Sequence, residues 1–214
     1  GGKPFFLGLG FTKPHLDWVA PKKYWDMYAA DDIKLAEYQE KSKNGVDRAY
    51  HNSGELGSYS DSGGNFIYKG LDSRKLSEAE QRHLIHGYYA CVSYIDAQVG
   101  KLLDELDRLD LAKNTTVVLW GDHGWHLGDH GLWCKHSNFE QATRSPLIIA
   151  LPNGKGNTTT TPTGFVDLFP TLCEINGIET PKQAEGESLI PIIKNPKTER
   201  TYTVSQFHRG KKMM

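Results

Sequence analysis

The most constraining stretch of this sequence is an apolar, β-branched run over residues 115–120, which ends in a glycine. A run of this kind predicts a buried strand. Asp122 and His123 follow directly, so a carboxylate and an imidazole arrive together at the carboxyl end of that strand. Open α/β sheets place their ligands at this end of a strand. The sequence therefore predicts an α/β protein with a ligand site just after residue 120.

The loop that follows is rich in glycine and ends close to a lysine. Gly124, Gly128 and Gly131 allow tight turns and a close approach of the backbone to a ligand. Lys135 brings a cation to the same loop. A pair of metal ligands with a nearby cation suits an enzyme that acts on an oxyanion ester. Two plainer interpretations stay open, namely a hydrogen-bonded Asp-His turn and an ordinary solvated lysine.

Hydrophobic periodicity predicts the framework around this loop. Apolar residues recur at spacings of three and four after a Ser-x-x-Glu capping box, which predicts an amphipathic helix over residues 77–110. Strands are predicted at 4–9 and 147–151, in one sheet with 115–120 and flanked by that helix. Shorter predicted elements are helices at 21–28, 33–41 and 165–175, a strand at 201–207, and loops at 44–65 and 158–161.

Composition limits the partners that this chain can be expected to have. The chain has 214 residues, enough for one domain with a sizeable core. Its net charge of -1 gives no reason to expect nucleic acid or an acidic membrane as partner. No apolar run approaches the roughly 20 residues of a membrane-spanning helix. Three cysteines do not make a disulfide scaffold.

Several segments together carry the pattern of a known family. Residues 122–135 read Asp-His-Gly-Trp-x-Leu-Gly-Asp-His-Gly-x-Trp-x-Lys, followed by Ser-Asn and then by Pro-Leu-Ile at 146–148. Near the start, the strand predicted at 4–9 is followed by Lys-Pro-His at residues 13–15. With weaker matches at 92–100 and 166–172, the chain resembles the type I sulfatases, and most of all their iduronate-2-sulfatase-like group. The resemblance implies an alkaline-phosphatase/sulfatase-like layered sheet with flanking helices.

The same resemblance assigns roles to individual residues. It implies that Asp122 and His123 ligate a divalent metal, that Lys135 and His15 are catalytic and bracket the sulfate and the leaving oxygen, and that Trp125 binds substrate. Ca²⁺ is the metal that the family implies. The residues alone leave the metal open, because a carboxylate suits hard cations and an imidazole suits transition metals.

Two features of the family are not found. Its nucleophile is a formylglycine made from the cysteine of a Cys-x-Pro-Ser-Arg motif, and Cys91, Cys134 and Cys173 lie in no such motif. Its Asp-Asp metal pair follows a first strand, which Asp31-Asp32 does not. We therefore expect a fold that is incomplete at the N-terminus: residues 1–190 as the C-terminal part of the catalytic α/β domain, and 191–214 as the start of a C-terminal subdomain. The missing N-terminal half, carrying the formylglycine, is then an expected partner.

The resemblance implies part of a sulfuric ester hydrolase that cleaves sulfate esters of a carbohydrate, with the isolated chain inactive. A periplasmic, secreted or lysosomal location is implied by the resemblance, while the residues leave the compartment open. Two alternatives remain: a phosphodiesterase or phosphonate hydrolase of the same superfamily, and a non-catalytic carbohydrate-binding fragment. Lys135 and the Lys-Pro-His turn favour the sulfatase.

Overall fold

The chain divides into two compact units, and each is described by itself. The computed structural model describes residues 3–59, 76–209 and 212–213. The units are Gly1–Ile149 and Ala150–Met214. This division does not test the predicted domain boundary after residue 190, which stays a prediction. None of the described helices combines the length and the apolar character needed to cross a bilayer.

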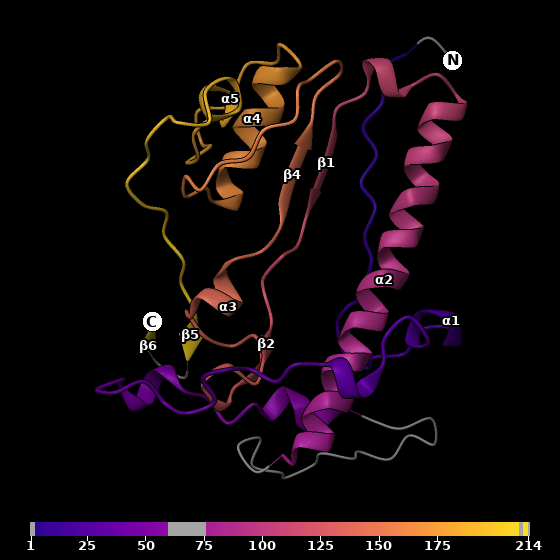
Figure 1. The fold of residues 1–214 in the computed structure, drawn as a ribbon. Helices are drawn as coiled ribbons and strands as arrows, with labels where there is room; N and C mark the ends of the chain where they lie inside the picture. Colours follow the sequence, from indigo (N-terminus) through magenta and orange to yellow (C-terminus); the bar gives the residue numbers. More distant parts are fainter. Residues whose placement is uncertain (1–2, 60–75, 210–211, 214) are drawn as a thin grey trace. The chain divides into compact units, whose positions relative to one another are not determined.

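A single long helix, α2, is the main element of the first unit (Figure 1). It spans Glu78–Arg108, 31 residues, and Ser77 caps it in the predicted capping box with Glu80. The Ser77 backbone N–H donates to a Glu80 carboxylate oxygen at 2.7 Å, which satisfies a donor at the helix start. The predicted helix over 77–110 is thus confirmed.

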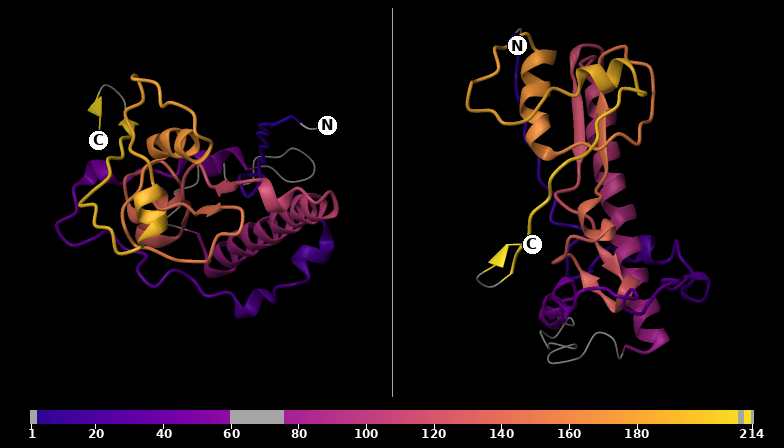
Figure 2. Two further views of the ribbon diagram at one scale, coloured as in Figure 1. Left: turned by 90° about the horizontal axis from the view of Figure 1, so that it is seen from above. Right: turned by 90° about the vertical axis from the view of Figure 1, so that its left-hand side faces the viewer.

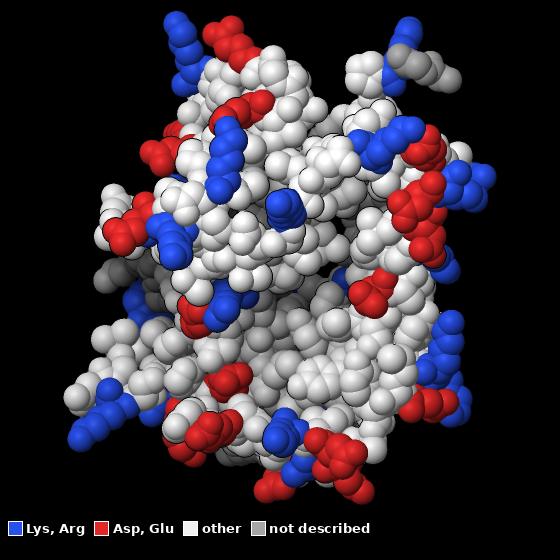
Figure 3. Space-filling model, turned by 45° about the horizontal axis from the view of Figure 1, so that its top comes forward, with Lys and Arg blue, Asp and Glu red and all other residues white. Residues whose placement is uncertain are grey.

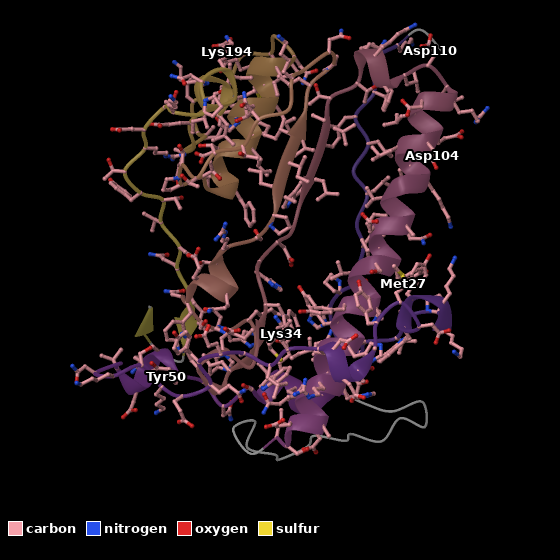
Figure 4. The ribbon with its side chains drawn as sticks, in the orientation of Figure 1. Met27, Lys34, Tyr50, Asp104, Asp110 and Lys194 are labelled. Carbon is pink, nitrogen blue, oxygen red and sulfur yellow. The ribbon has the colours of Figure 1, made fainter. Side chains whose placement is uncertain are left out.

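The two halves of α2 have different surroundings. Leu84, Ile85 and Cys91 are buried in the N-terminal half, whereas residues 101–110 are almost all exposed. Asp104 and Asp110 mark the exposed half in Figure 4. The N-terminal half therefore holds the core.

Short elements surround α2. Helix α1, Lys22–Trp25, packs against α2 (Figure 2), within the helix predicted at 21–28. The helix predicted at 33–41 is wrong, because this stretch is irregular after the 3-10 turn η1, Ala30–Asp32. The remaining 3-10 turns of this unit are η2 (Asp47–Ala49), η3 (Gly54–Ser58), η5 (Ala112–Asn114) and η6 (Asp129–Gly131).

The sheet is smaller than predicted. Strand β1, Val117–Trp120, pairs with β4, Leu147–Ala150, as expected. The chain runs down β1 and back up β4, and α3, Glu140–Thr143, precedes β4 (Figure 1). The strand predicted at 4–9 is wrong: this segment is extended but has no strand partner among the described residues, and its apolar side chains are exposed. An apolar run predicts burial only where a neighbouring strand is present to cover it.

Aromatic side chains form the core of the first unit. Trp18 is 2% exposed and contacts Tyr59, Tyr88 and Trp125, with ring centroids 5.9 to 6.2 Å apart. Leu84 of α2 and Trp133 of the glycine-rich loop belong to the same cluster. The core therefore joins α2, the loop and the chain after residue 13.

The second unit is built around two short helices. The 3-10 turn η7, Phe165–Asp167, runs into α4, Leu168–Ile175, which confirms the predicted helix, and α5, Ile190–Lys194, packs against α4. The strand predicted at 201–207 is wrong, since these residues are irregular and all but Phe207 are exposed. Strand β5, His208–Arg209, begins after them and pairs antiparallel with β6, Lys212–Met213.

On the face that Figure 3 shows, basic and acidic side chains are interspersed, in keeping with the small net charge.

A buried carboxylate holds the second unit together. Asp167 is fully buried and accepts hydrogen bonds from the backbone N–H groups of Gly164, at 2.7 Å, and Glu187, at 3.0 Å. Arg200 adds a bidentate ion pair. Burial acts to raise the pKa of Asp167, but Arg200 and the two N–H donors outweigh it and hold the pKa below its usual range. The carboxylate is therefore ionised at neutral pH.

Replacement of this carboxylate should loosen the second unit. We expect Asp167→Ala to cost about 3 to 5 kcal/mol of stability, because Arg200 and two N–H groups lose their acceptor. Hydrogen exchange of the α4 amides measures this loss of stability. Tryptophan fluorescence would not report on it, because none of the tryptophans lies in the second unit. Glu199→Ala, which removes an exposed carboxylate beside Arg200, should leave that exchange within about 0.5 kcal/mol of wild type. Equal protection in both variants would contradict the role of Asp167.

Candidate active site on the loop after strand β1

The glycine-rich loop folds into a tight hairpin. Strands β2, His126–Leu127, and β3, Trp133–Cys134, pair antiparallel, with His126 opposite Cys134. Gly128 has a φ of 107° and donates its N–H to the Leu132 carbonyl at 2.9 Å. That conformation favours glycine, so the sequence selects the turn here. Lys135 follows β3 directly and is thereby held at the base of the hairpin.

A second segment brings His15 to this hairpin. The His15 N–H donates to the Thr12 carbonyl at 3.0 Å, and Trp18 Nε1 donates to the Pro14 carbonyl at 2.7 Å, which ties the segment to the core. His15 Nδ1 donates to the Leu16 carbonyl at 2.9 Å. This bond leaves Nε2 as the ring nitrogen available for chemistry.

Three of the predicted residues meet at one place. Lys135 Nζ lies 2.7 Å from His15 Nε2, although the two residues are 120 positions apart. Trp125 adjoins both, with Lys135 Nζ 5.0 Å from one of its rings and the His15 ring 5.3 Å away. The structure thus brings Lys135, His15 and Trp125 together as the sequence predicts, while their roles stay predictions.

Asp122 and His123 lie beside this group. The His123 ring is 5.9 Å from Trp125, and its Nδ1 donates to the Gly124 carbonyl at 2.8 Å. His123 Nε2 lies 3.4 Å from Asp122 Oδ2, and the Asp122 side chain is 85% exposed. An imidazole oriented by a carbonyl next to a carboxylate fits the donor set of a metal site. Across residues 3–59, 76–209 and 212–213, no three His, Cys, Asp or Glu side chains gather to hold a metal.

Glu55 is a site residue that the sequence reasoning missed. It lies in η3, and Lys135 Nζ donates a hydrogen bond to its Oε1. The same oxygen lies 2.8 Å from His15 Nε2, and His136 Nδ1 lies 3.6 Å from Oε2. A single glutamate in a segment predicted as loop 44–65 carries no local pattern that singles it out. Residues 60–65 of that predicted loop lie outside the described residues.

His126 is more buried than its position in a glycine-rich loop suggests. The side chain is fully buried, and its Nε2 is 2.7 Å from Ser137 Oγ. Burial, together with the charge of His130, lowers the pKa of His126 to about 4. His130 itself supports the loop, because its ring stacks on Phe139 at 4.8 Å and its backbone N–H donates to the Tyr38 carbonyl at 2.7 Å. His126 is therefore a neutral structural residue at physiological pH.

Comparison with known proteins identifies the family. Residues 1–178 match the sulfatase family, and the chain belongs to it. A sulfatase of Formosa agariphila is 33% identical over 210 residues, which are 97% of this chain and 39% of that protein. Iduronate 2-sulfatase of Homo sapiens is 38% identical over 169 residues, 79% of this chain and 30% of that enzyme. The chain thus spans well under half the length of these relatives.

Solved structures confirm the fold class. The phosphonate monoester hydrolase from Silicibacter pomeroyi superposes with a TM-score of 0.69 and 28% identity, covering 91% of this chain and 38% of that chain. A protein solved in complex with its substrate D-glucosamine-2-N,6-O-disulfate gives a TM-score of 0.70 at 21% identity, covering 94% of this chain and 50% of that chain. The chain has the α/β fold of the alkaline-phosphatase and sulfatase proteins.

The lowered pKa of the buried His126 leads to a prediction of how the stability of the first unit depends on pH. Its pKa is about 4 in the folded state against about 6.5 when unfolded, so below pH 6.5 the unfolded chain binds a proton that the folded chain does not. Stability is therefore complete above pH 6.5 and falls progressively toward pH 4. We expect a loss of about 2 kcal/mol from this residue between pH 7.5 and pH 5.

Urea unfolding followed by tryptophan fluorescence measures this loss, because every tryptophan lies within residues 1–149. His126→Gln keeps a hydrogen-bonding group near Ser137 but does not titrate. The variant should lose about 2 kcal/mol less than wild type over the same pH interval. Parallel pH profiles for the two proteins would show that His126 does not titrate in this way.

Proposed function

We propose that this chain supplies part of the active site of a sulfuric ester hydrolase that acts on a sulfated carbohydrate, as iduronate 2-sulfatase does. The observation that carries the proposal is the contact between Lys135 Nζ and His15 Nε2, 2.7 Å apart, next to Trp125, which also contacts His123. These groups come from two distant segments of the family-matched region.

The residues suit cleavage of a sulfate ester. The Lys135 ammonium, whose side chain is only 18% exposed, attracts a non-bridging oxygen of the sulfate more strongly than a solvated lysine does. His15 Nε2 faces the same point and can hold a proton for the leaving alkoxide. Trp125 presents an aromatic surface beside both groups, which suits the apolar face of a sugar ring.

Asp122 and His123 would hold the divalent cation, for which Ca²⁺ is our proposal. Such a cation supplies Lewis-acid stabilisation of the negative charge on the sulfate oxygens. Two protein ligands leave a hard cation mostly hydrated, so further ligands must come from elsewhere. We propose that residues outside this chain supply these ligands and the formylglycine nucleophile, and that the isolated chain has no turnover.

A phosphonate monoester hydrolase is the second candidate. The structural similarity to the enzyme from Silicibacter pomeroyi, at 28% identity, favours it. Sulfate esters and phosphonate monoesters both present a tetrahedral oxyanion that a bound cation can stabilise, so substrate assays have to separate the two reactions. A non-catalytic carbohydrate-binding fragment is the remaining alternative, and it predicts sugar binding without turnover in any longer protein.

The lysine gives a direct test of the site. In the longer protein that contains this chain, Lys135→Met should lower kcat/KM on an aryl sulfate and on sulfated disaccharides by about 10²- to 10³-fold. Lys34→Met, at an exposed position marked in Figure 4, is the matched control and should stay within about twofold of wild type. Faster hydrolysis of a phosphonate monoester than of any sulfate ester would favour the second candidate. Full activity in Lys135→Met would contradict both.

The fragment proposal is tested by comparing the 214-residue chain with the longer protein. We expect no sulfatase turnover from the isolated chain, and turnover in the longer protein that falls at least about 10²-fold on Asp122→Ala or on removal of divalent metal. Asp104→Ala, an exposed carboxylate on α2, serves as the control. Turnover by the isolated chain that is abolished by Asp122→Ala would show that the nucleophile lies within these residues.

A further inference from the structure

The Glu55 carboxylate contacts both groups to which the proposed function assigns the chemistry. Its Oε1 accepts a hydrogen bond from Lys135 Nζ and lies 2.8 Å from His15 Nε2. We propose that Glu55 is a positioning residue of this site, which holds Lys135 beside His15 and balances the lysine charge until an oxyanion binds. This inference rests on the proposed function and adds to it a residue that the loop pattern does not contain.

The first part of the proposed role of Glu55 is to orient the Lys135 side chain. Lysine has a long flexible side chain, and fixing it in one rotamer is opposed by the loss of conformational entropy. Glu55, with a side chain only 15% exposed, provides a fixed acceptor for that ammonium. The His15 ring is already oriented, because its Nδ1 donates to the Leu16 carbonyl at 2.9 Å. Glu55 therefore places the mobile lysine against an imidazole that the backbone has fixed.

Charge balance is the second half. A lysine that is 18% exposed needs an anion nearby, and Glu55 supplies one when no substrate is bound. Burial acts to raise the pKa of Glu55, but the hydrogen bond and charge of Lys135, with His136 and His15, outweigh it and lower the pKa. The carboxylate is therefore ionised at neutral pH. Its second oxygen, Oε2, lies 3.6 Å from His136 Nδ1, which is beyond hydrogen-bond distance but close enough for the His136 charge to help lower the pKa of Glu55.

These two effects act on different steps. A carboxylate beside Lys135 weakens the attraction for any bound anion, ester or product alike. The same carboxylate keeps the lysine in the geometry that turnover requires. Removal of Glu55 should therefore tighten the binding of a simple anion while it slows the reaction. A residue that only stabilised the fold would impair both measurements together.

Two variants and one control test this inference in the longer protein. Glu55→Ala should lower kcat about tenfold or more, by analogy with the loss seen when a group that orients a metal ligand is removed. It should also lower the Kd for inorganic sulfate, measured by calorimetry, about threefold or more. Glu55→Gln keeps the volume and an oxygen acceptor but not the charge, so it should recover most of kcat while sulfate binding stays tight. Glu37→Gln, at an exposed carboxylate of the same unit, should change neither.

The outcomes separate the possible failures. A kcat within twofold of wild type in Glu55→Ala, or weaker sulfate binding together with a lower melting temperature, would overturn the proposal. Where the alanine variant does not fold, unchanged sulfate affinity in Glu55→Gln overturns the charge-balancing role. If the wild type cleaves only phosphonate monoesters, the proposed function fails, but kcat on that ester and the sulfate titration still test Glu55. If it cleaves neither ester, the sulfate titration alone decides.

Discussion

The candidate site depends on the packing of Trp18. This nearly buried indole contacts Tyr88 of α2, Trp125 of the glycine-rich loop, and Tyr59 just after η3. Its Nε1 also donates to the Pro14 carbonyl, which fixes the turn that carries His15. One side chain thus sets the positions of three segments that are distant in sequence. Because close-packed protein cores deform little, the positions of the polar groups on these segments are fixed as well.

That packing determines which side chains of the site are ready for chemistry. Lys135 and Glu55 lie against the core at 18% and 15% exposure, so their ion pair is screened by water less than a surface pair is. Asp122, at 85% exposure, has no such environment. The cationic part of the site is therefore preorganised, whereas its carboxylate stays hydrated. This asymmetry is what the proposed division of the site between this chain and residues outside it would produce.

Local patterns predicted those elements whose stabilising contacts are themselves local. The capping box and the apolar spacing of α2 act within one helix, and the β1 and β4 runs pair with each other. The segments 4–9 and 201–207 carry strand-like residues but are irregular in the structure. Nearly all of their side chains are exposed, which shows that strand propensity alone does not form a strand.

The residues of the candidate site also show that local sequence patterns miss contacts between distant segments. Asp122, His123 and Lys135 lie on one loop with a readable pattern, and His15 follows a recognisable turn. Glu55 belongs to the same cluster only because the fold brings its segment to Lys135, 80 positions away. A charged side chain that acts through another residue needs no motif, since its partners define it. A residue that orients another side chain can therefore be identified only from three-dimensional contacts, even where a sequence pattern has already identified the family.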